Sequence, residues 1–187
     1  MQQNHHFTGN VLALDLATVT GWACGAPGET PKFGTTRFAK KGATHPAIYR
    51  GMRSWLNQWI NGKTAQLIVY ESAAIPSLML GRTTATTGRL LCGLTEHVEE
   101  LCYERIELNE ASVQQVRAHF IGTNRNRRKL AKQLTMDRCH ELGWMVEDDN
   151  QADACALWSL QICILRPDIA PLHSPLLRGR SIVNDIY

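Results

Sequence analysis

Three acidic residues lie in parts of this sequence that are otherwise apolar. Asp15 follows the run Val-Leu-Ala-Leu, and Glu71 follows the run Leu-Ile-Val-Tyr. Asp153 lies near the start of the last predicted helix, on a stripe of apolar residues that continues to Ile164. A buried carboxylate without a partner costs several kcal/mol in desolvation free energy. These three acids therefore need a physical reason for their positions.

A shared metal site would supply that reason. Carboxylates brought close together repel one another and take up protons unless a cation lies among them. Such hard oxygen ligands suit Mg²⁺ or Mn²⁺. Two ions ~4 Å apart can activate a water and stabilise the leaving oxygen of a phosphodiester. If the two strands are neighbours and the helix covers them, Asp15, Glu71 and Asp153 converge, and Asp149 lies on the same helix face as Asp153.

Each acid also has a purely structural explanation. Asp15 could accept hydrogen bonds from the backbone amides of the turn before Thr18, and Glu71 could pair with Arg82 or Arg89. These explanations, however, require two unrelated causes to place an acid at the end of each central strand, a coincidence that a shared site does not need.

The acids near the last helix have a similar alternative. Asp148, Asp149 and Asn150 form a typical helix N-cap cluster, and Asn150 with Asp153 imitates a capping box. This alternative does not explain why the cluster falls on the helix that should cover the two strands. The metal site explains all of the acids at once.

Basic residues gather between positions 117 and 138, against the single acid Asp137. The net charge of +3 is mild, but this cluster could neutralise several backbone phosphates. A solvated helix face is the alternative. The basic residues that we expect to contact DNA are Arg125, Arg127, Arg128, Lys129 and Lys132; the segment also contains Arg117 and Arg138.

The elements that must position these residues begin with strands. Two strands are predicted within 10–24 and a third within 31–39. An amphipathic helix covers 48–60, and a strand buried on both faces covers 67–70, before a loop around Pro76. The first three strands are expected to form an antiparallel meander.

The second half of the chain is predicted to be mainly helical. Helices are expected at 83–102, 110–119, 128–142 and about 150–165, with a strand at 105–108. A meander followed by this alternation predicts an α/β fold, with a mixed sheet flanked by helices.

The composition is that of a single globular domain. The 187 residues are 44% hydrophobic and 20% charged, and we expect flexible ends at about 1–9 and 167–187. No apolar run approaches the ~20 residues that span a bilayer, so a cytoplasmic protein with no membrane partner is expected. The six cysteines are expected to be mostly buried free thiols.

Three segments resemble, in order, the motifs of RuvC-type Holliday-junction resolvases. Residues 14–23 resemble the first-strand motif, in which an aspartate ends the strand and Thr-Gly-aromatic begins the next. Residues 67–71 resemble the second acidic strand, and 148–154 the C-terminal Asp-Ala helix motif of phage and bacterial RuvC-like proteins. The resemblance covers nearly the whole chain. It implies an RNase-H-like mixed five-stranded sheet, with three antiparallel strands and then parallel strands, flanked by helices.

The resemblance also implies a function. It implies a homodimer that cuts opposed strands of a four-way DNA junction with two Mg²⁺ ions, which Mn²⁺ can replace. Asp15, Glu71 and Asp153 would be metal ligands. The bacterial resolvases commonly carry a further acid where this chain has Asn150, so Asp149 is the substitute and Asn150 the alternative.

The resolvases also place a lysine or arginine ahead of their penultimate helix, near the scissile phosphate. Arg128 and Lys129 are the candidates here. Two other functions stay open from the sequence. One is a nuclease of the same fold that cuts RNA in an RNA–DNA hybrid. The other is a non-catalytic junction-binding protein, which Asn150 in place of the acid would favour.

Overall fold

A computed structural model describes residues 7–72, 84–123, 125 and 127–169 of the chain. Its centre is a five-stranded sheet with the order β3-β2-β1-β4-β5. The strands are β1 (Val11–Asp15), β2 (Thr20–Gly25), β3 (Lys32–Thr36), β4 (Leu67–Glu71) and β5 (Glu107–Ala111). The first three strands are antiparallel, and β4 and β5 run parallel to β1, as the sequence predicted.

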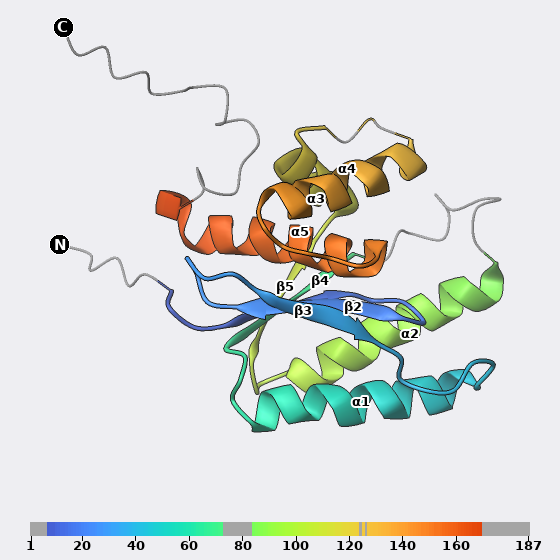
Figure 1. The fold of residues 1–187 in the computed structure, drawn as a ribbon. Helices are drawn as coiled ribbons and strands as arrows, with labels where there is room; N and C mark the ends of the chain where they lie inside the picture. The colour runs from blue at the N-terminus through green and yellow to red at the C-terminus, as the bar shows by residue number, and fades with distance from the viewer. Residues whose placement is uncertain (1–6, 73–83, 124, 126, 170–187) are drawn as a thin grey trace, which may run out of the picture.

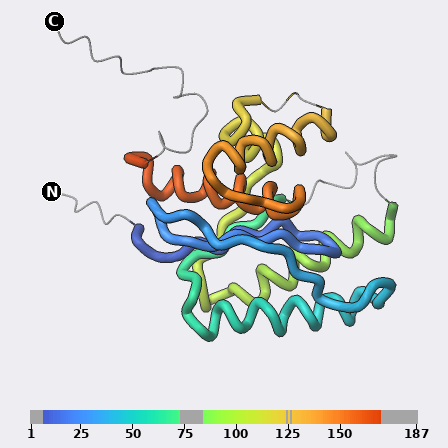
Figure 2. The backbone as a smooth tube through the Cα atoms, viewed as in Figure 1, coloured from blue at the N-terminus to red at the C-terminus, as the bar shows by residue number. Residues whose placement is uncertain are grey.

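Helices cover both faces of the sheet (Figure 1). On one face lie α1 (His45–Asn61) and α2 (Ala85–Cys102), which pack against each other. On the other face lies α5 (Asp149–Leu165), and α3 (Val113–Ile121) and α4 (Arg128–Glu141) pack over it. Figure 2 shows that the sheet and the layer of α1 and α2 come from the N-terminal part of the chain, and that the layer of α3, α4 and α5 comes from the C-terminal part.

The two faces of β1 and β4 are both buried, which explains their continuous apolar runs. Side chains alternate across a strand. Val11 and Ala13 therefore enter the core beneath α5, whereas Leu12 and Leu14 enter the core beneath α1 and α2. The strand β4 divides its side chains between the two cores in the same way.

The α5 helix is buried on most of its surface because it is covered by the sheet on one side and by α3 and α4 on the other. This differs from the amphipathic stripe that the sequence predicted. Ile164, expected on the core stripe, is 59% exposed, whereas Trp158 is fully buried.

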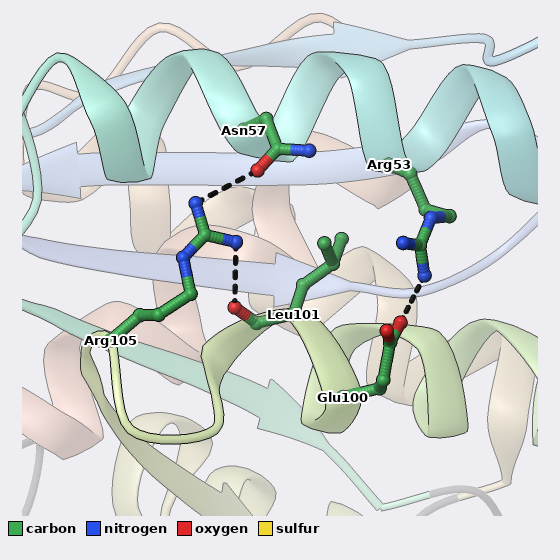
Figure 3. A network of polar contacts seen from close by, with 5 residues as sticks. All are labelled: Arg53, Asn57, Glu100, Leu101 and Arg105. Atoms are coloured by element: carbon green, nitrogen blue, oxygen red, sulfur yellow. Dashed lines mark hydrogen bonds and ion pairs between the residues drawn. The ribbon is translucent and has the colours of Figure 1, made fainter.

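The fifth strand is shifted by two to three residues from its predicted position at 105–108. The chain after α2 turns at Glu104, whose φ is 57°, and Arg105 serves the turn rather than the strand. Its guanidinium donates to the Leu101 carbonyl at 3.0 Å and to the side chains of Asn57 and Asn61 at 3.0 and 2.9 Å. Figure 3 shows the bonds of Arg105 to Leu101 and Asn57 beside the Arg53–Glu100 ion pair, which joins α1 to α2.

The helix after β5 also begins later than the predicted residue 110. Ser112 and Gln115 form a capping box, and the helix ends at Gly122, whose φ is 74°. A capping box satisfies two backbone N–H groups that would otherwise have no partner, so it fixes the start of a helix. Residues 110 and 111 complete β5 instead.

The predicted flexible ends are only partly described. Phe7 packs against the core, and residues 167–169 form a short 3₁₀ helix, while 1–6 and 170–187 lie outside the described residues. The predicted loop around Pro76 also lies outside them. Within the described ranges, no helix combines the length and apolar character that crossing a bilayer requires. All six cysteines are free thiols, and four of them are buried.

Candidate active site

The register of the central strands places two acids side by side. Leu14 pairs with Tyr70, so Asp15 and Glu71 are the next residues of two parallel neighbours. Because side chains alternate, Asp15 continues the face of Ala13, which is the α5 face. The same alternation places Glu71 on this face. Two carboxylates thus lie at the same end of the sheet, towards α5.

The start of α5 closes over this end because Gly21 has no side chain. Gly21 lies opposite Asp15 in the β1–β2 pair. A Cβ at Gly21 would lie 1.9 Å from the carbonyl oxygen of Asn150. The first turn of α5 therefore packs directly on the β2 backbone, and Asp153 follows one turn later.

The start of α5 is fixed by Asp148, a member of the N-cap cluster seen in the sequence, and not by the alternative Asn150–Asp153 capping box. The Asp148 carboxylate accepts a hydrogen bond of 2.9 Å from the backbone N–H of Gln151. This N-cap leaves the side chains of Asn150 and Asp153 available to face the sheet.

These residues line one cavity of about 580 Å³. Its acidic wall consists of Asp15, Glu71 and Asp153, with the amide of Asn150 beside them. We call this space the carboxylate cavity. The structure thus brings together three of the four acids that the sequence singled out.

Burial and mutual repulsion disfavour the charged forms of these acids. Burial, with repulsion from Asp153, raises the pKa of Asp15 to about 7. Burial, with repulsion from Asp15 and Asp153, raises the pKa of Glu71 to about 8. Burial also raises the pKa of Asp153. A cation placed among them would relieve both effects.

Three basic side chains line the same cavity as the acids. Arg117 from α3 and Arg128 and Lys132 from α4 line the carboxylate cavity. Arg117 favours the charged form of Glu71, and Lys132 and Arg128 favour that of Asp15. The cavity therefore combines buried anions with a cationic wall.

Of the five basic residues expected to contact DNA, Arg128 and Lys132 line this cavity. Lys129 does not line it, so of the two candidates for a residue near the scissile phosphate only Arg128 lies beside the acids. Arg125, Arg127 and Lys129 are exposed on the surface around the start of α4. Arg138, from the same basic segment, is instead 6% exposed and paired with Glu141 at 3.0 Å.

Asp149 takes a different position from the other acids. Its carboxylate forms an ion pair with Lys132, and its side chain does not line the carboxylate cavity. The neighbouring Asn150 does line it. The structure therefore presents Asn150 beside Asp15 and Asp153, and the role of Asp149 as a metal ligand stays a prediction.

The structural alternatives for Asp15 and Glu71 find no support in the described residues. The turn after Asp15 is closed by Thr20, whose hydroxyl donates to the Ala17 carbonyl at 2.9 Å. Among the described residues no ion pair joins Arg89 to Glu71, and Arg82 lies outside them.

The donor set fits a hard divalent ion such as Mg²⁺, because it offers three carboxylates and an amide oxygen in a partly desolvated cavity. Among the described residues, no three such side chains are already arranged around one point as a ligand set. Binding an ion would therefore require the carboxylates to turn toward it.

The raised pKa values predict how the metal-free protein responds to pH. Asp15 and Glu71 bind protons more tightly when folded than their ordinary values of 3.8 and 4.5 allow. The stability that this contributes is present below about pH 4 and is lost as pH rises through about 7 to 8. In EDTA, the melting temperature should fall between pH 5.5 and 8.5 more steeply than that of an Asp15→Asn/Glu71→Gln variant.

Divalent metal provides the second arm of this experiment. Mg²⁺ or Mn²⁺ should raise the melting temperature of the unaltered protein, and more at pH 8.5 than at pH 5.5, because protons compete for the same oxygens. Identical pH profiles for the protein and the double variant would contradict the electrostatic description of the cavity.

The fold can be compared with known structures. The Thermus thermophilus RuvC structure matches with a TM-score of 0.60 and 10% identity, over 86% of this chain and 96% of that chain. T. thermophilus RuvC in complex with Holliday junction substrate matches at 0.59 and 9%, with the same coverage. The yeast mitochondrial Holliday junction resolvase Ydc2 matches at 0.57 and 14%, over 83% of this chain and 78% of that chain.

No family model and no curated protein sequence matches the chain. The structural matches nevertheless agree with the mixed five-stranded sheet and flanking helices that the three sequence motifs implied. The resemblance is therefore confirmed at the level of the fold: the chain has the RNase-H-like fold of the RuvC-type Holliday-junction resolvases.

Proposed function

We propose that this protein is a metal-dependent, structure-selective endonuclease that resolves Holliday junctions or other branched DNA. The observation that carries the proposal is the convergence of Asp15, Glu71 and Asp153 in one cavity with a cationic wall. The likeness to two resolvase folds, one of them solved with a Holliday junction substrate, supports branched DNA as the substrate class.

Asp15, Glu71 and Asp153 would hold the metal ions, with Asn150 or Asp149 as a further oxygen ligand. Two bound Mg²⁺ or Mn²⁺ ions would activate a water and stabilise the leaving oxygen of the phosphodiester. The carboxylates lie in a buried place, where burial and mutual repulsion raise the pKa values of Asp15 and Glu71 and so favour a bound cation.

The cationic wall has a separate task. A phosphate that approaches three buried carboxylates is repelled by them, and Arg117, Arg128 and Lys132 offset this repulsion. Arginine can hold two phosphate oxygens at once in a fixed orientation, whereas lysine acts as a point charge. We assign the orientation of the scissile phosphate to Arg128 and Arg117, and charge compensation to Lys132.

The Lys132–Asp149 ion pair suggests how that charge is held in place. Lysine has a flexible stem, so a partner that restrains the ammonium keeps it at the cavity wall. In this arrangement Asn150 supplies the further oxygen ligand and Asp149 positions Lys132.

Wild-type protein and a set of matched nucleic acids test the proposal. A four-way junction should be cut in Mg²⁺ and Mn²⁺ but not in EDTA, and a linear duplex of the same sequence should be cut far more slowly. An RNA–DNA hybrid is the third substrate, and faster cleavage of the hybrid would replace the proposal with the hybrid-nuclease alternative. Junction binding without cleavage in either metal would favour a non-catalytic junction-binding protein.

Resolution of a junction requires two opposed cuts, and two symmetric cuts require two copies of the site. We therefore propose a homodimer. The junction products should show paired incisions at symmetric positions, and sedimentation of the active protein should give the mass of two chains. An active, strictly monomeric protein would contradict the dimer and leave the cleavage reaction in place.

A further inference from the structure

A second, smaller cavity of about 230 Å³ adjoins the proposed active site. Its charged wall comes from the segment between β3 and the first turn of α1 and consists of Arg37, Lys40, Lys41 and His45. We call this space the basic cavity. These residues are separate in the sequence from the longer basic segment that precedes α4.

Among the residues that the structure describes, no acidic side chain lines the basic cavity. Within the described part of the chain, Arg37, Lys40 and Lys41 take part in no ion pair, and all three are exposed. This contrasts with Lys132 of the carboxylate cavity, whose ammonium already has an acidic partner. Three exposed cations around one depression repel one another, so an anion held there would lower the electrostatic energy.

The two cavities share part of their walls. Thr18, Thr87 and Leu90 line both of them, so a polymer could pass from one to the other without leaving the protein surface. The N-terminal ends of α1, α2 and α5 lie on the same side of the molecule (Figure 1). The first turn of α2, with Thr86 and Thr87 in the wall, adds a backbone environment that favours anions.

We propose that the basic cavity binds backbone phosphates of the same DNA strand whose scissile phosphate lies in the carboxylate cavity. The proposal rests on the endonuclease function. It extends the DNA surface from the side of the sheet that carries α3 and α4 to the side that carries α1 and α2. Arg37, Lys40 and Lys41 are the phosphate contacts, and Thr18 and Thr87 lie between the two ends of the bound segment.

Nucleic acid is the occupant that the arrangement favours. A strand carries a regular series of negative charges, so the segment that leaves the carboxylate cavity brings further phosphates over Thr18 and Thr87. The residues offered are lysine, arginine and hydroxyl side chains, which are the usual contacts to phosphate oxygens. Such contacts position the strand without reading its sequence.

The test compares two charge-matched double variants. Lys40→Gln/Lys41→Gln removes two charges from the basic cavity, and Lys32→Gln/Lys63→Gln removes two exposed charges that line neither cavity. Fluorescence anisotropy measures binding of a labelled four-way junction in EDTA over a range of KCl concentrations. Each phosphate contact adds about 0.9 to the slope of log K against log salt, so the first variant should lose about 2 from the slope and bind roughly tenfold or more weakly near 0.1 M salt.

The control variant should keep a slope close to that of the wild type, and both should melt near the wild-type temperature because the altered side chains are exposed. Junction cleavage is measured on the same proteins. Binding of labelled oligoglutamate, which stands for an acidic protein partner, is measured as well. If wild type does not cut junctions but the salt-dependence slope is reduced in Lys40→Gln/Lys41→Gln, the endonuclease function fails and the proposed DNA surface stands.

Four results would overturn the proposal. An unchanged slope in Lys40→Gln/Lys41→Gln would do so even if the wild type cuts junctions normally, and so would an equal loss in the control. If wild type binds no DNA, both the surface and the endonuclease function fail. Oligoglutamate binding that is lost in Lys40→Gln/Lys41→Gln, with DNA affinity unchanged, would assign the basic cavity to an acidic protein partner.

Discussion

An Asp15→Asn variant should lose junction cleavage by about 10³-fold or more while it still folds and binds DNA. Asparagine has nearly the same shape but a weaker, neutral oxygen ligand. Metal ions stabilise transition-state charge by several kcal/mol, and each 1.36 kcal/mol is a factor of ten in rate. The measurement is single-turnover cleavage of a four-way junction in Mg²⁺ and in Mn²⁺.

Two controls make this result specific. The pKa of Asp15 is raised to about 7, so the neutral side chain should stabilise metal-free protein at pH 8, and a melting curve in EDTA verifies folding. Junction affinity in EDTA should be equal or higher, because one negative charge has left the cavity that receives a phosphate. If Asp15→Asn cut junctions at the wild-type rate, the assignment of the carboxylate cavity as the active site would be wrong.

The same assay separates the possible ligands. Glu71→Gln and Asp153→Asn should resemble Asp15→Asn, since all three carboxylates line the carboxylate cavity. If Asp149 only holds Lys132, Asp149→Asn should lose about 10- to 100-fold, which is the usual effect of losing a supporting contact. A loss as large as that of Asp15→Asn would restore Asp149 as a direct ligand in place of Asn150.

The convergence of the acids was predictable because strand geometry transmits sequence position directly. A strand alternates its faces, so an acid that ends each of two apolar runs falls on a definite side of the sheet once the strands pair in parallel. Asp15 and Glu71 satisfy this condition through the Leu14–Tyr70 pairing. Asp153 joined them because the α5 backbone lies on β2 at Asn150, and Asp153 follows Asn150 by about one helical turn.

The cationic wall was less predictable because it depends on how helices pack, not on their own periodicity. Arg117 and Lys132 enter the cavity from two different helices that lie over α5. The sequence grouped Arg138 with them, although packing buries it beside Glu141. A helical wheel of α4 places Arg128 and Lys132 one turn apart, and this was the signal that could have separated them from Lys129.

The displaced boundaries have a local cause. Side chains that bond to the backbone ended α2 and began α3, and such bonds outweigh the β propensity of a few residues. Arg105 illustrates this, since the sequence placed it in a strand and the structure uses it to hold the end of α2 against α1. The basic cavity could not be predicted for a related reason. Residues 37–45 have no periodicity, so the sequence does not show that their side chains line a cavity instead of a solvated loop.

Gly21 offers the strongest test of how the fold positions the site. Gly21→Ala should lower the free energy of unfolding by about 1–3 kcal/mol, because the added Cβ would overlap the α5 backbone and overpacking costs about this much. The atoms it meets are the Asn150 carbonyl oxygen at 1.9 Å and carbon at 2.5 Å. No side-chain rotation relieves such a contact, so the first turn of α5 must move. Junction cleavage should fall about 100-fold, since a displacement of about 1 Å is enough for that loss.

Gly88→Ala is the matched control. Gly88 lies within α2, and a Cβ there would meet nothing within 4 Å. Alanine in a helix is favoured over glycine by about 0.5–1 kcal/mol, so this variant should unfold at slightly higher urea and cut junctions normally. Urea unfolding and single-turnover cleavage are measured on both proteins. If Gly21→Ala unfolds and cuts like Gly88→Ala, the close approach of α5 to β2 does not hold Asp153 against Asp15 and Glu71, and the carboxylates must be positioned by another part of the fold.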